Sequence, residues 1–463
     1  MGSAMHMRSD AVVLFGVTGD LVSKKLFPAL YELTRRDRLD VPVIGVARSP
    51  WDDQQLVTMA RKSVTEVTDE IDDETFDRLA DNLSMISGNY ADPTTYQRLA
   101  ERLRDAERPV FYLAIPPAVF GSVVEGLAAV GLADRGRAIV EKPFGRDLES
   151  SRELERTLAS AFASERVFRI DHYLGKEAVE SLYAFRFANR LFEPLWNNEH
   201  IDNIQVTLAE GFGTQGRAGF YDTVGATRDV LQNHILQVVA LIAMEAPASE
   251  DTAAFREAEA AVLRQVAPLS PESTVRGQYA GYRDEPGVAA DSNTETFVST
   301  RLTVDSPRWA GVPFYLRTGK SLPGTATEVV VEFKQPQRPL IPAERGTVGL
   351  ANLLRFRLGR GDGITMSIQA KSPGAEVASR PVDLSVDFGA AFGRRQEAYE
   401  RLLDDAMDGQ HLRFARAETI EQEWRIVEPI LDLSTAVQSY EKGSWGPADA
   451  DALAGGWHTP DLR

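Results

Sequence analysis

The stretch Ala11-Val12-Val13-Leu14-Phe15-Gly16-Val17-Thr18-Gly19-Asp20-Leu21 decides the fold of the amino-terminal part of the chain. Five apolar residues predict a buried strand, the two glycines predict a tight turn, and the spacing of Leu26, Leu30 and Leu33 predicts a helix after it. Glycine lets the backbone approach a pyrophosphate closely, and the amino end of a helix offers free N–H groups to an anion. Because the glycines are only two and lie three apart, an ordinary tight turn stays an alternative.

The alternation of strand and helix continues along the next 150 or so residues. Further strands are predicted at residues 43–47, 110–114, 138–140 and 167–170, and helices at residues 121–131 and 148–161. This alternation is typical of βαβ units, so we expect an α/β domain over residues 11–175, with a Rossmann-like, doubly wound parallel sheet.

Parallel strands bring their carboxyl ends to one edge of a sheet, where α/β folds bind ligands. Arg48 follows the second strand, at the place where an acid would bind the ribose hydroxyls of NAD, so the arginine favours the 2'-phosphate of NADP. Together with Gly16, we expect Tyr112, Lys142 and Asp171 to line this crevice. Pro143 restricts the backbone beside Lys142, and a cis peptide bond there would aim the lysine.

Residues 169–177 read Arg169-Ile170-Asp171-His172-Tyr173-Leu174-Gly175-Lys176-Glu177 and follow a short apolar run. They collect an acid, an imidazole, a phenol and an ammonium within six positions. This mixture suits a site that binds an anion and moves a proton, although a solvated surface turn could also collect these residue types.

Proton removal near neutral pH favours histidine, and the chain has six. His6, His411 and His458 fall in a terminus or a loop, and His200 falls in a polar stretch. His234 lies within a predicted helix at residues 226–246, on the face that carries its apolar residues. A core histidine with a satisfied hydrogen bond is the alternative for His234, and Asp171 is a carboxylate that could hold its ring.

Beyond residue 296 the pattern changes to short alternating segments that predict antiparallel strands. We expect these strands, with helices on one side, to form a larger α+β domain over residues 176–446, with a mainly antiparallel sheet that offers a surface for a homodimer or homotetramer. Glu210 and Asp229 suit the hydroxyls of a sugar, although a surface acid and a first-turn acid are the plainer interpretations. Residues 447–463 are expected to be loosely held, and residues 1–10 to be a cloning remnant or a disordered start.

Composition narrows the classes of partner. With 463 residues, the chain is long enough for two domains, and its net charge of −17 argues against nucleic acid and anionic membranes as partners. In such an acidic chain, a site for a phosphorylated ligand requires a local cluster of basic side chains. The absence of cysteine fits a reducing cytosol, so we expect a cytoplasmic protein, and we expect no metal site.

Five motifs in order make the chain resemble the glucose-6-phosphate dehydrogenases over nearly its whole length. They are Gly16-Val17-Thr18-Gly19-Asp20-Leu21 with Lys24-Lys25-Leu26-Phe27-Pro28, Glu141-Lys142-Pro143-Phe144-Gly145, the stretch at residues 169–177, Arg228-Asp229-Val230-Leu231-Gln232-Asn233-His234, and Arg317-Thr318-Gly319-Lys320. The resemblance implies oxidation of β-D-glucose 6-phosphate to 6-phosphoglucono-1,5-lactone with reduction of NADP, the entry step of the pentose phosphate pathway.

The resemblance also implies a role for each matching residue. His234 would take the proton of the C1 hydroxyl, and Asp171 would orient it. The 6-phosphate would be bound by His172, Tyr173 and Lys176, the sugar hydroxyls by Glu210 and Asp229, with Lys320 a further substrate contact and Lys142 a bridge between substrate and nicotinamide. The coenzyme would be held by Gly16, Val17, Thr18, Gly19, Asp20, Leu21, Ser23, Arg48 and Tyr112.

One position departs from the family pattern. Many relatives carry a second basic residue five positions after the lysine that matches Lys320, whereas this chain has Thr325, so we expect weaker substrate binding. Two alternatives stay open at this point: a dehydrogenase of another hexose 6-phosphate, and a non-catalytic sensor of NADP or a sugar phosphate on the same fold.

Overall fold

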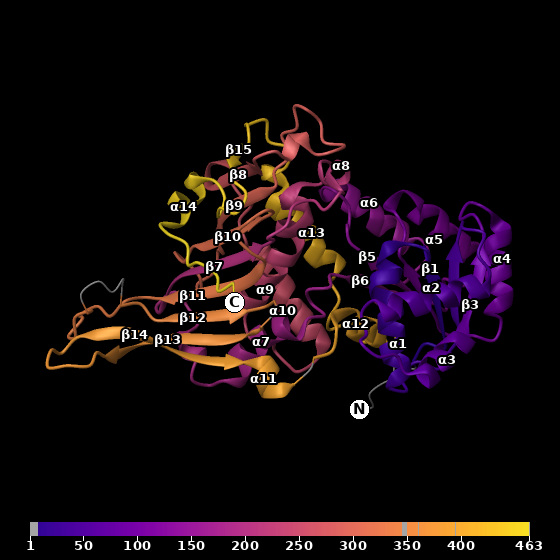
Figure 1. Ribbon diagram of the computed structural model, residues 1–463, viewed down its shortest axis with the longest axis horizontal. Coiled ribbons are helices and arrows are strands. Elements are labelled where there is room, and N and C mark those ends of the chain that lie inside the picture. The colour runs from indigo at the N-terminus through magenta and orange to yellow at the C-terminus, as the bar shows by residue number, and fades with distance from the viewer. Residues whose placement is uncertain (1–7, 345–349, 360, 394, 463) are drawn as a thin grey trace. The chain divides into compact units, whose positions relative to one another are not determined.

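The computed structural model describes residues 8–344, 350–359, 361–393 and 395–462, and the chain divides into two compact units (Figure 1). The first unit comprises Met1–Lys176 and Gln396–Ile420, and the second comprises Glu177–Arg395 and Glu421–Arg463. Among the described residues, none of the helices combines the length and the apolar character that crossing a membrane requires.

The first unit contains a six-stranded parallel sheet in the order β3-β2-β1-β4-β5-β6. Its strands are β1 (Ala11–Phe15), β2 (Val43–Ala47), β3 (Leu83–Ser87), β4 (Pro109–Leu113), β5 (Arg137–Glu141) and β6 (Val167–Ile170). Every residue of β1, β2 and β4 is buried, as expected for a parallel sheet that helices cover on both faces. The expected Rossmann-like sheet is confirmed, and β3 is a strand that the sequence analysis missed.

The helices of the first unit are α1 (Phe27–Arg35), α2 (Asp53–Thr65), α3 (Asp73–Asn82), α4 (Pro93–Arg102), α5 (Phe120–Ala129), α6 (Leu148–Ala159) and α12 (Ala398–Asp408), with the π-helix η1 (Val22–Leu26) and the 3₁₀ turns η2 (Pro117–Val119) and η3 (Ser164–Arg166). Four of them begin at aspartates, namely Asp52, Asp72, Asp92 and Asp147, whose side chains accept a backbone N–H of the first turn. These caps satisfy N–H groups that the helices leave without an internal partner.

The helix α12 belongs to the first unit, whereas the sequence analysis assigned it to the second domain. Leu402, Leu403, Ala406 and Met407 are fully buried in the hydrophobic core that also contains residues of β1, β2 and β4. After α12 the chain returns to the sheet, where the N–H of Ala415 donates to the carbonyl of Arg169 at 3.0 Å. An amphipathic pattern predicts a helix but does not identify the sheet that the helix covers.

Arg8 and Ser9 are anchored to the same helix. Arg8 forms ion pairs with Asp404 and Asp408 at 2.7 and 2.5 Å, and the N–H of Ser9 donates to the carbonyl of Met407. The prediction of a disordered start is therefore wrong for residues 8–10, the cloning origin of these residues stays a prediction, and residues 1–7 lie outside the described residues.

The second unit contains a nine-stranded mixed sheet in the order β14-β13-β12-β11-β7-β10-β9-β8-β15 (Figure 1). Its strands are β7 (Ile201–Ala209), β8 (Thr274–Tyr279), β9 (Phe297–Leu302), β10 (Phe314–Gly319), β11 (Ala326–Phe333), β12 (Leu353–Arg357), β13 (Gly363–Lys371), β14 (Ser379–Asp387) and β15 (Gln438–Tyr440). Most neighbours are antiparallel, as expected, but β7 pairs with β10 and β8 pairs with β15 in parallel.

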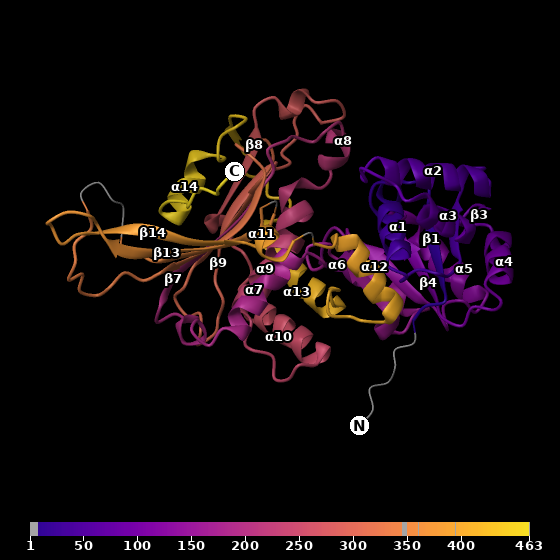
Figure 2. The ribbon, with the colours of Figure 1, turned by 60° about the horizontal axis from the view of Figure 1, so that its bottom comes forward.

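The helices of the second unit are α7 (Glu177–Ala188), α8 (Ala218–Tyr221), α9 (Leu236–Ala243), α10 (Thr252–Gln265), α11 (Phe388–Phe392) and α14 (Ala448–Ala454), with the π-helix η5 (Thr227–Ile235) and the 3₁₀ turns η4 (Glu193–Leu195), η6 (Pro271–Ser273), η7 (Tyr282–Asp284) and η8 (Glu428–Ile430). In α13 (Ala417–Val427) the chain passes from the first unit into the second. The continuous helix formed by η5 and α9 lies against β7, β9 and β10, and α7 and α10 pack on α9 (Figure 2).

Side chains satisfy the carbonyl groups at the carboxyl end of α9. Arg186 donates to the carbonyls of Leu241 and Met244 at 2.6 Å, and the indole N–H groups of Trp196 and Trp309 donate to those of Ile242 and Ala243. This end of the helix is thereby fixed within the unit, because the last carbonyls of a helix need partners from outside it.

The described part of the carboxyl-terminal tail is packed against the sheet, so the prediction that residues 447–463 are loosely held is wrong for residues 447–462, and Arg463 lies outside the described residues. The guanidinium of Arg317 packs on the rings of both Trp445 and Trp457, at 4.7 and 4.2 Å from their centroids. The N–H of His458 donates to the side chain of Gln205, and its ring lies 3.0 Å from a carboxylate oxygen of Glu332.

We predict that Trp457→Ala destabilises the second unit, because it removes one of the two rings that stack on a buried arginine. A desolvated cation–π contact contributes about 1–2 kcal/mol, so the unfolding midpoint should fall by roughly 2–8 °C. Differential scanning calorimetry measures this change. An unchanged midpoint would mean that the tail contributes no stability.

Candidate active site

The turn after β1 brings the backbone close to neighbouring strands. Gly16 has a positive φ of 77°, and a Cβ there would lie 2.1 Å from the carbonyl oxygen of Ala114. Its N–H donates to the carbonyl of Val46 and to the hydroxyl of Tyr90, each at 2.9 Å. Only glycine fits this position, and the helix that follows begins at Asp20. The turn and helix amino end therefore fit the pyrophosphate of a dinucleotide.

The side chains of Val17 and Ser23, both proposed to lie at the coenzyme, make contacts within the protein. The side chain of Val17 is buried and packs over Gly45, where a Cβ would lie 2.9 Å from it. The hydroxyl of Ser23 lies 2.8 Å from that of Ser63 on α2. Because its side chain is buried, Val17 could contact a coenzyme only through its backbone.

Arg48 directly follows β2, and its side chain is exposed. The hydroxyl of Ser49, the next residue, donates to that of Thr18 at 3.4 Å. This hydrogen bond connects the end of β2 to the glycine turn. A cation at this strand end, with no acid directly before or after it in the sequence, suits a phosphate on the ribose.

Tyr112, which we expected at the coenzyme, is fully buried within β4. Its hydroxyl donates to the carboxylate of Glu141, and burial raises the pKa of Glu141 to about 7. A ring without exposed surface does not reach a bound coenzyme, so Tyr112 is removed from the coenzyme residues. The sequence does not predict which way this side chain points, because β4 is apolar on both of its faces.

Lys142 and Asp171 follow neighbouring parallel strands. Glu141 is paired with Ile170 in the sheet, so the two next residues lie at the same edge. The peptide bond between Lys142 and Pro143 is cis.

The turn at residues 171–176 is held from two sides. A carboxylate oxygen of Asp171 accepts the N–H of Tyr173 at 2.9 Å, and Asp171 itself is 1% exposed. From α12, Arg401 donates to the carbonyl of Gly175 at 2.7 Å, and the ring of Tyr399 stacks on His172. The alternative of a solvated surface turn is therefore excluded.

Lys176 carries a perturbed ammonium. Its nitrogen lies 3.5 Å from the centroid of the Tyr173 ring. Burial lowers the pKa of Lys176 to about 8, although the carboxylates of Asp171 and Glu397 oppose this shift. The group can therefore change its charge just above neutral pH.

Three residues that we expected at the substrate, Glu210, Asp229 and Lys320, lie close together in the second unit. Ala209 pairs with Gly319 where β7 and β10 end, so Glu210 and Lys320 lie side by side. The ammonium of Lys320 forms an ion pair with the carboxylate of Glu210 and lies 3.7 Å from that of Asp229. Carboxylates are strong hydrogen-bond acceptors, so this group suits a substrate that carries hydroxyl groups.

His234 lies within η5, five residues after Asp229, and its side chain is buried. In an α-helix, residues five apart are rotated by about 140° from each other. In a π-helix the hydrogen bonds join residues five apart, so Asp229 and His234 lie one turn apart on the same side. The sequence predicts an ordinary helix here, and the π-helix was missed because apolar spacing does not distinguish the two.

Other residues that organise the site were also missed. Tyr90, Tyr399 and Arg401 support the glycine turn and the turn at residues 171–176 from distant positions in the sequence. None of them lies within a recognisable motif. Thr325, which stands where relatives carry a basic residue, accepts the N–H of Gly211 at 3.0 Å and so lies beside Glu210.

The chain is similar to known proteins over nearly its whole length. The model of the glucose-6-phosphate dehydrogenase NAD binding domain matches residues 13–181, and that of the glucose-6-phosphate dehydrogenase C-terminal domain matches residues 183–458. Glucose-6-phosphate 1-dehydrogenase 1 of Mycobacterium tuberculosis (strain CDC 1551 / Oshkosh) is 43% identical over 458 residues, which cover 98% of this chain and 97% of the relative.

Solved structures give the same result. The glucose-6-phosphate 1-dehydrogenase of Mycobacterium avium superposes with a TM-score of 0.91 at 43% identity, over 99% of this chain and all of the other. A glucose-6-phosphate dehydrogenase in complex with its substrate glucose-6-phosphate superposes with a TM-score of 0.90 at 31% identity, over the whole of both chains. With both family models matched and the fold shared over its full length, this chain belongs to the glucose-6-phosphate dehydrogenase family.

Proposed function

We propose that this protein oxidises β-D-glucose 6-phosphate at C1, giving 6-phosphoglucono-1,5-lactone with reduction of NADP, the entry step of the pentose phosphate pathway. The observation that carries the proposal is the group formed by Glu210, Asp229 and Lys320, on the same unit as the helix of His234. A cation and two acids, with an imidazole on the same helix as one of the acids, suit a substrate with many hydroxyl groups that must lose a proton. The family and the named substrate of the solved relative support this assignment.

The residues of the first unit fit a nicotinamide dinucleotide. The close approach at Gly16 and the helix after it leave backbone N–H groups of the turn at residues 16–23 for the pyrophosphate. Arg48 would bind the 2'-phosphate, which is the reason for proposing NADP rather than NAD. When bound, the coenzyme supplies a nicotinamide ring that can accept a hydride.

The remaining residues bind the substrate and move its proton. His172, Tyr173 and Lys176 would bind the 6-phosphate, and Glu210 and Asp229 would accept hydrogen bonds from the sugar hydroxyls. Lys320 would be a further substrate contact, and Lys142 would reach both substrate and nicotinamide. His234 would take the proton of the C1 hydroxyl, and Asp171 would orient its ring and stabilise the imidazolium.

We also propose a homodimer or homotetramer in the cytoplasm. The terminal strand β14 of the nine-stranded sheet exposes Leu384 and Val386, which are half accessible. An exposed apolar edge strand favours association with another chain. The lack of cysteine suits a reducing compartment.

A steady-state assay tests the proposed reaction. Absorbance of the reduced nicotinamide would be followed with NADP or NAD, and with glucose 6-phosphate or its galactose epimer. We expect the highest kcat/KM for glucose 6-phosphate with NADP. A preference for the other sugar would favour the alternative dehydrogenase, and no reduction at all would favour a sensor.

We predict that His234→Asn lowers kcat by about 10²- to 10⁴-fold with little change in KM, because the variant lacks the base but keeps the substrate contacts. Steady-state kinetics measure both constants. His200→Asn serves as the control, since the ring of His200 lies 3.0 Å from the side-chain oxygen of the nearby Asn197 and belongs to no proposed site group. An active His234→Asn enzyme would refute the role of the base.

Arg48→Ala should raise KM for NADP far more than KM for NAD, because only NADP carries the 2'-phosphate. Arg61→Ala, which removes an exposed arginine ion-paired with Asp73 on the same unit, should leave both constants unchanged. Equal weakening of the two coenzymes by Arg48→Ala would contradict a 2'-phosphate contact.

The pKa of Lys176 predicts a pH dependence of substrate capture. With a pKa of about 8, the ammonium is charged below that pH and loses its charge above it, so kcat/KM for glucose 6-phosphate should fall as the pH rises through 8. Lys176→Arg should move this fall to higher pH, because arginine stays charged. A fall at the same pH in Lys176→Arg would assign it to another group.

A further inference from the structure

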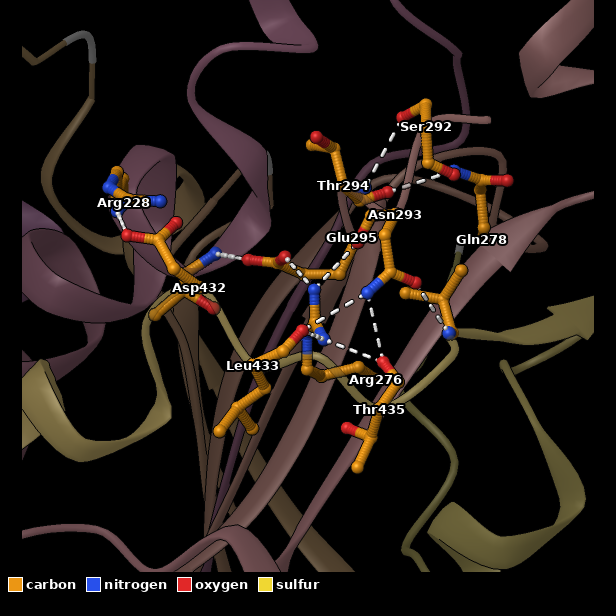
Figure 3. Close-up of polar contacts among 12 residues, drawn as sticks. Arg228, Arg276, Gln278, Ser292, Asn293, Thr294, Glu295, Asp432, Leu433 and Thr435 are labelled. Atoms are coloured by element: carbon orange, nitrogen blue, oxygen red, sulfur yellow. Dashed lines mark hydrogen bonds and ion pairs between the residues drawn. The ribbon is translucent and has the colours of Figure 1, made fainter. Parts of the chain in front are cut away.

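A buried ion pair lies at the amino end of the helix that carries Asp229 and His234. The carboxylate of Glu295 and the guanidinium of Arg276 are 3.2 Å apart, and both residues are more than nine-tenths buried. Neither residue belongs to a motif used in the proposed reaction. Figure 3 shows the pair between the sheet and the start of this helix.

Glu295 holds two successive residues of the chain as it enters the helix. Its second carboxylate oxygen accepts the N–H of Thr227 at 3.0 Å, and its backbone carbonyl accepts the N–H of Ala226 at 2.9 Å. Gly225 has a positive φ of 74°, and a Cβ there would lie 2.8 Å from the carboxylate. The chain therefore turns directly onto Glu295, and the negative charge lies where the helix dipole is positive.

Arg276 fixes Glu295 in turn. Its guanidinium also donates to the carbonyl of Asn293 at 2.6 Å and to those of Leu433 and Thr435 at 3.0 and 3.2 Å (Figure 3). Glu295 is thus the carboxylate that balances a buried cation, and without it the cation would remain desolvated without a counter-charge. This arrangement leaves the carboxylate little freedom to move away from the helix.

The position of this helix end decides where the site residues lie. Asp229 is two residues and His234 seven residues beyond Thr227, within the π-helix η5. A π-helix is rare, and a change to α-helical hydrogen bonding would rotate the two side chains away from a common side. The other end of the helix is already fixed by Arg186, Trp196 and Trp309.

We propose that Glu295, held by Arg276, is a positioning residue that keeps η5 in the register in which Asp229 and His234 serve the same substrate. This inference rests on the proposed function. Misplacement of reacting groups by about 1 Å can cost about 10²-fold in rate, so the pair matters to catalysis although it touches no substrate.

The test compares Glu295→Gln with a matched control. Glu328→Gln removes a buried carboxylate that pairs with Arg355 at 2.8 Å between β11 and β12, away from η5. Both variants lose one buried carboxylate that pairs with an arginine of the second unit. Only Glu295→Gln should lower kcat, by about 10²-fold, with KM for NADP unchanged because the proposed coenzyme residues lie in the first unit.

An isotope effect separates a positioning role from a loss of folded protein. With substrate deuterated at C1, slower hydride transfer in Glu295→Gln should raise the primary isotope effect on kcat, whereas partial unfolding lowers the rate without changing it. If the single variant does not fold, Arg276→Met/Glu295→Ala, which leaves no cation without its partner, should fold and show the same raised isotope effect. Equal losses in Glu295→Gln and Glu328→Gln, or an unchanged isotope effect, would overturn the proposal.

Hydrogen exchange tests the inference without relying on activity. Amides of residues 226–235 should exchange faster in Glu295→Ala than in the parent, and Glu328→Gln should leave them unchanged. Unchanged exchange at these residues would also overturn the positioning role. A parent protein that reduces no NADP would instead contradict the proposed function.

Discussion

The parallel pairing of β7 with β10 is the constraint on which the second unit's part of the site depends. Because Ala209 and Gly319 are neighbours where these strands end, the next residues, Glu210 and Lys320, must lie together. A mainly antiparallel sheet thus acquires, at these two strands, an edge of the kind at which parallel sheets bind ligands. Asp229 completes the group from the helix that packs on the same strands.

That helix is held by different chemistry at its two ends. Neutral donors and one guanidinium satisfy the carbonyls at the carboxyl end, whereas a buried carboxylate accepts N–H groups at the amino end. Such fixed ends allow a π-helix to persist between them, and the π-helix brings the acid at 229 and the imidazole at 234 to one side. A second π-helix, η1, follows the glycine turn in the first unit. Both unusual helices therefore carry or adjoin residues proposed to bind ligands.

Most of the fold could be predicted from local patterns, because strands, glycine turns and amphipathic helices are encoded in short stretches. The glycine turn, the strands before Lys142 and Asp171, and the mainly antiparallel second sheet follow from such patterns. The features that were not predicted depend on residues far apart in the sequence. The core that receives α12, the packing of the tail on Arg317 and the burial of Tyr112 are decided by tertiary contacts. Glu295 was missed for the same reason, since a carboxylate just before a strand gives no sign of the helix that it holds.

The central claim is that one imidazole removes the proton and one carboxylate acts only through it. A double-mutant cycle with Asp171→Asn and His234→Asn measures this dependence directly through kcat. If Asp171 serves His234, the double variant should be no slower than His234→Asn alone, because the carboxylate has nothing left to orient. Losses that multiply, so that the double variant is slower than His234→Asn by the full factor of Asp171→Asn, would show that the two residues act independently and would contradict the account.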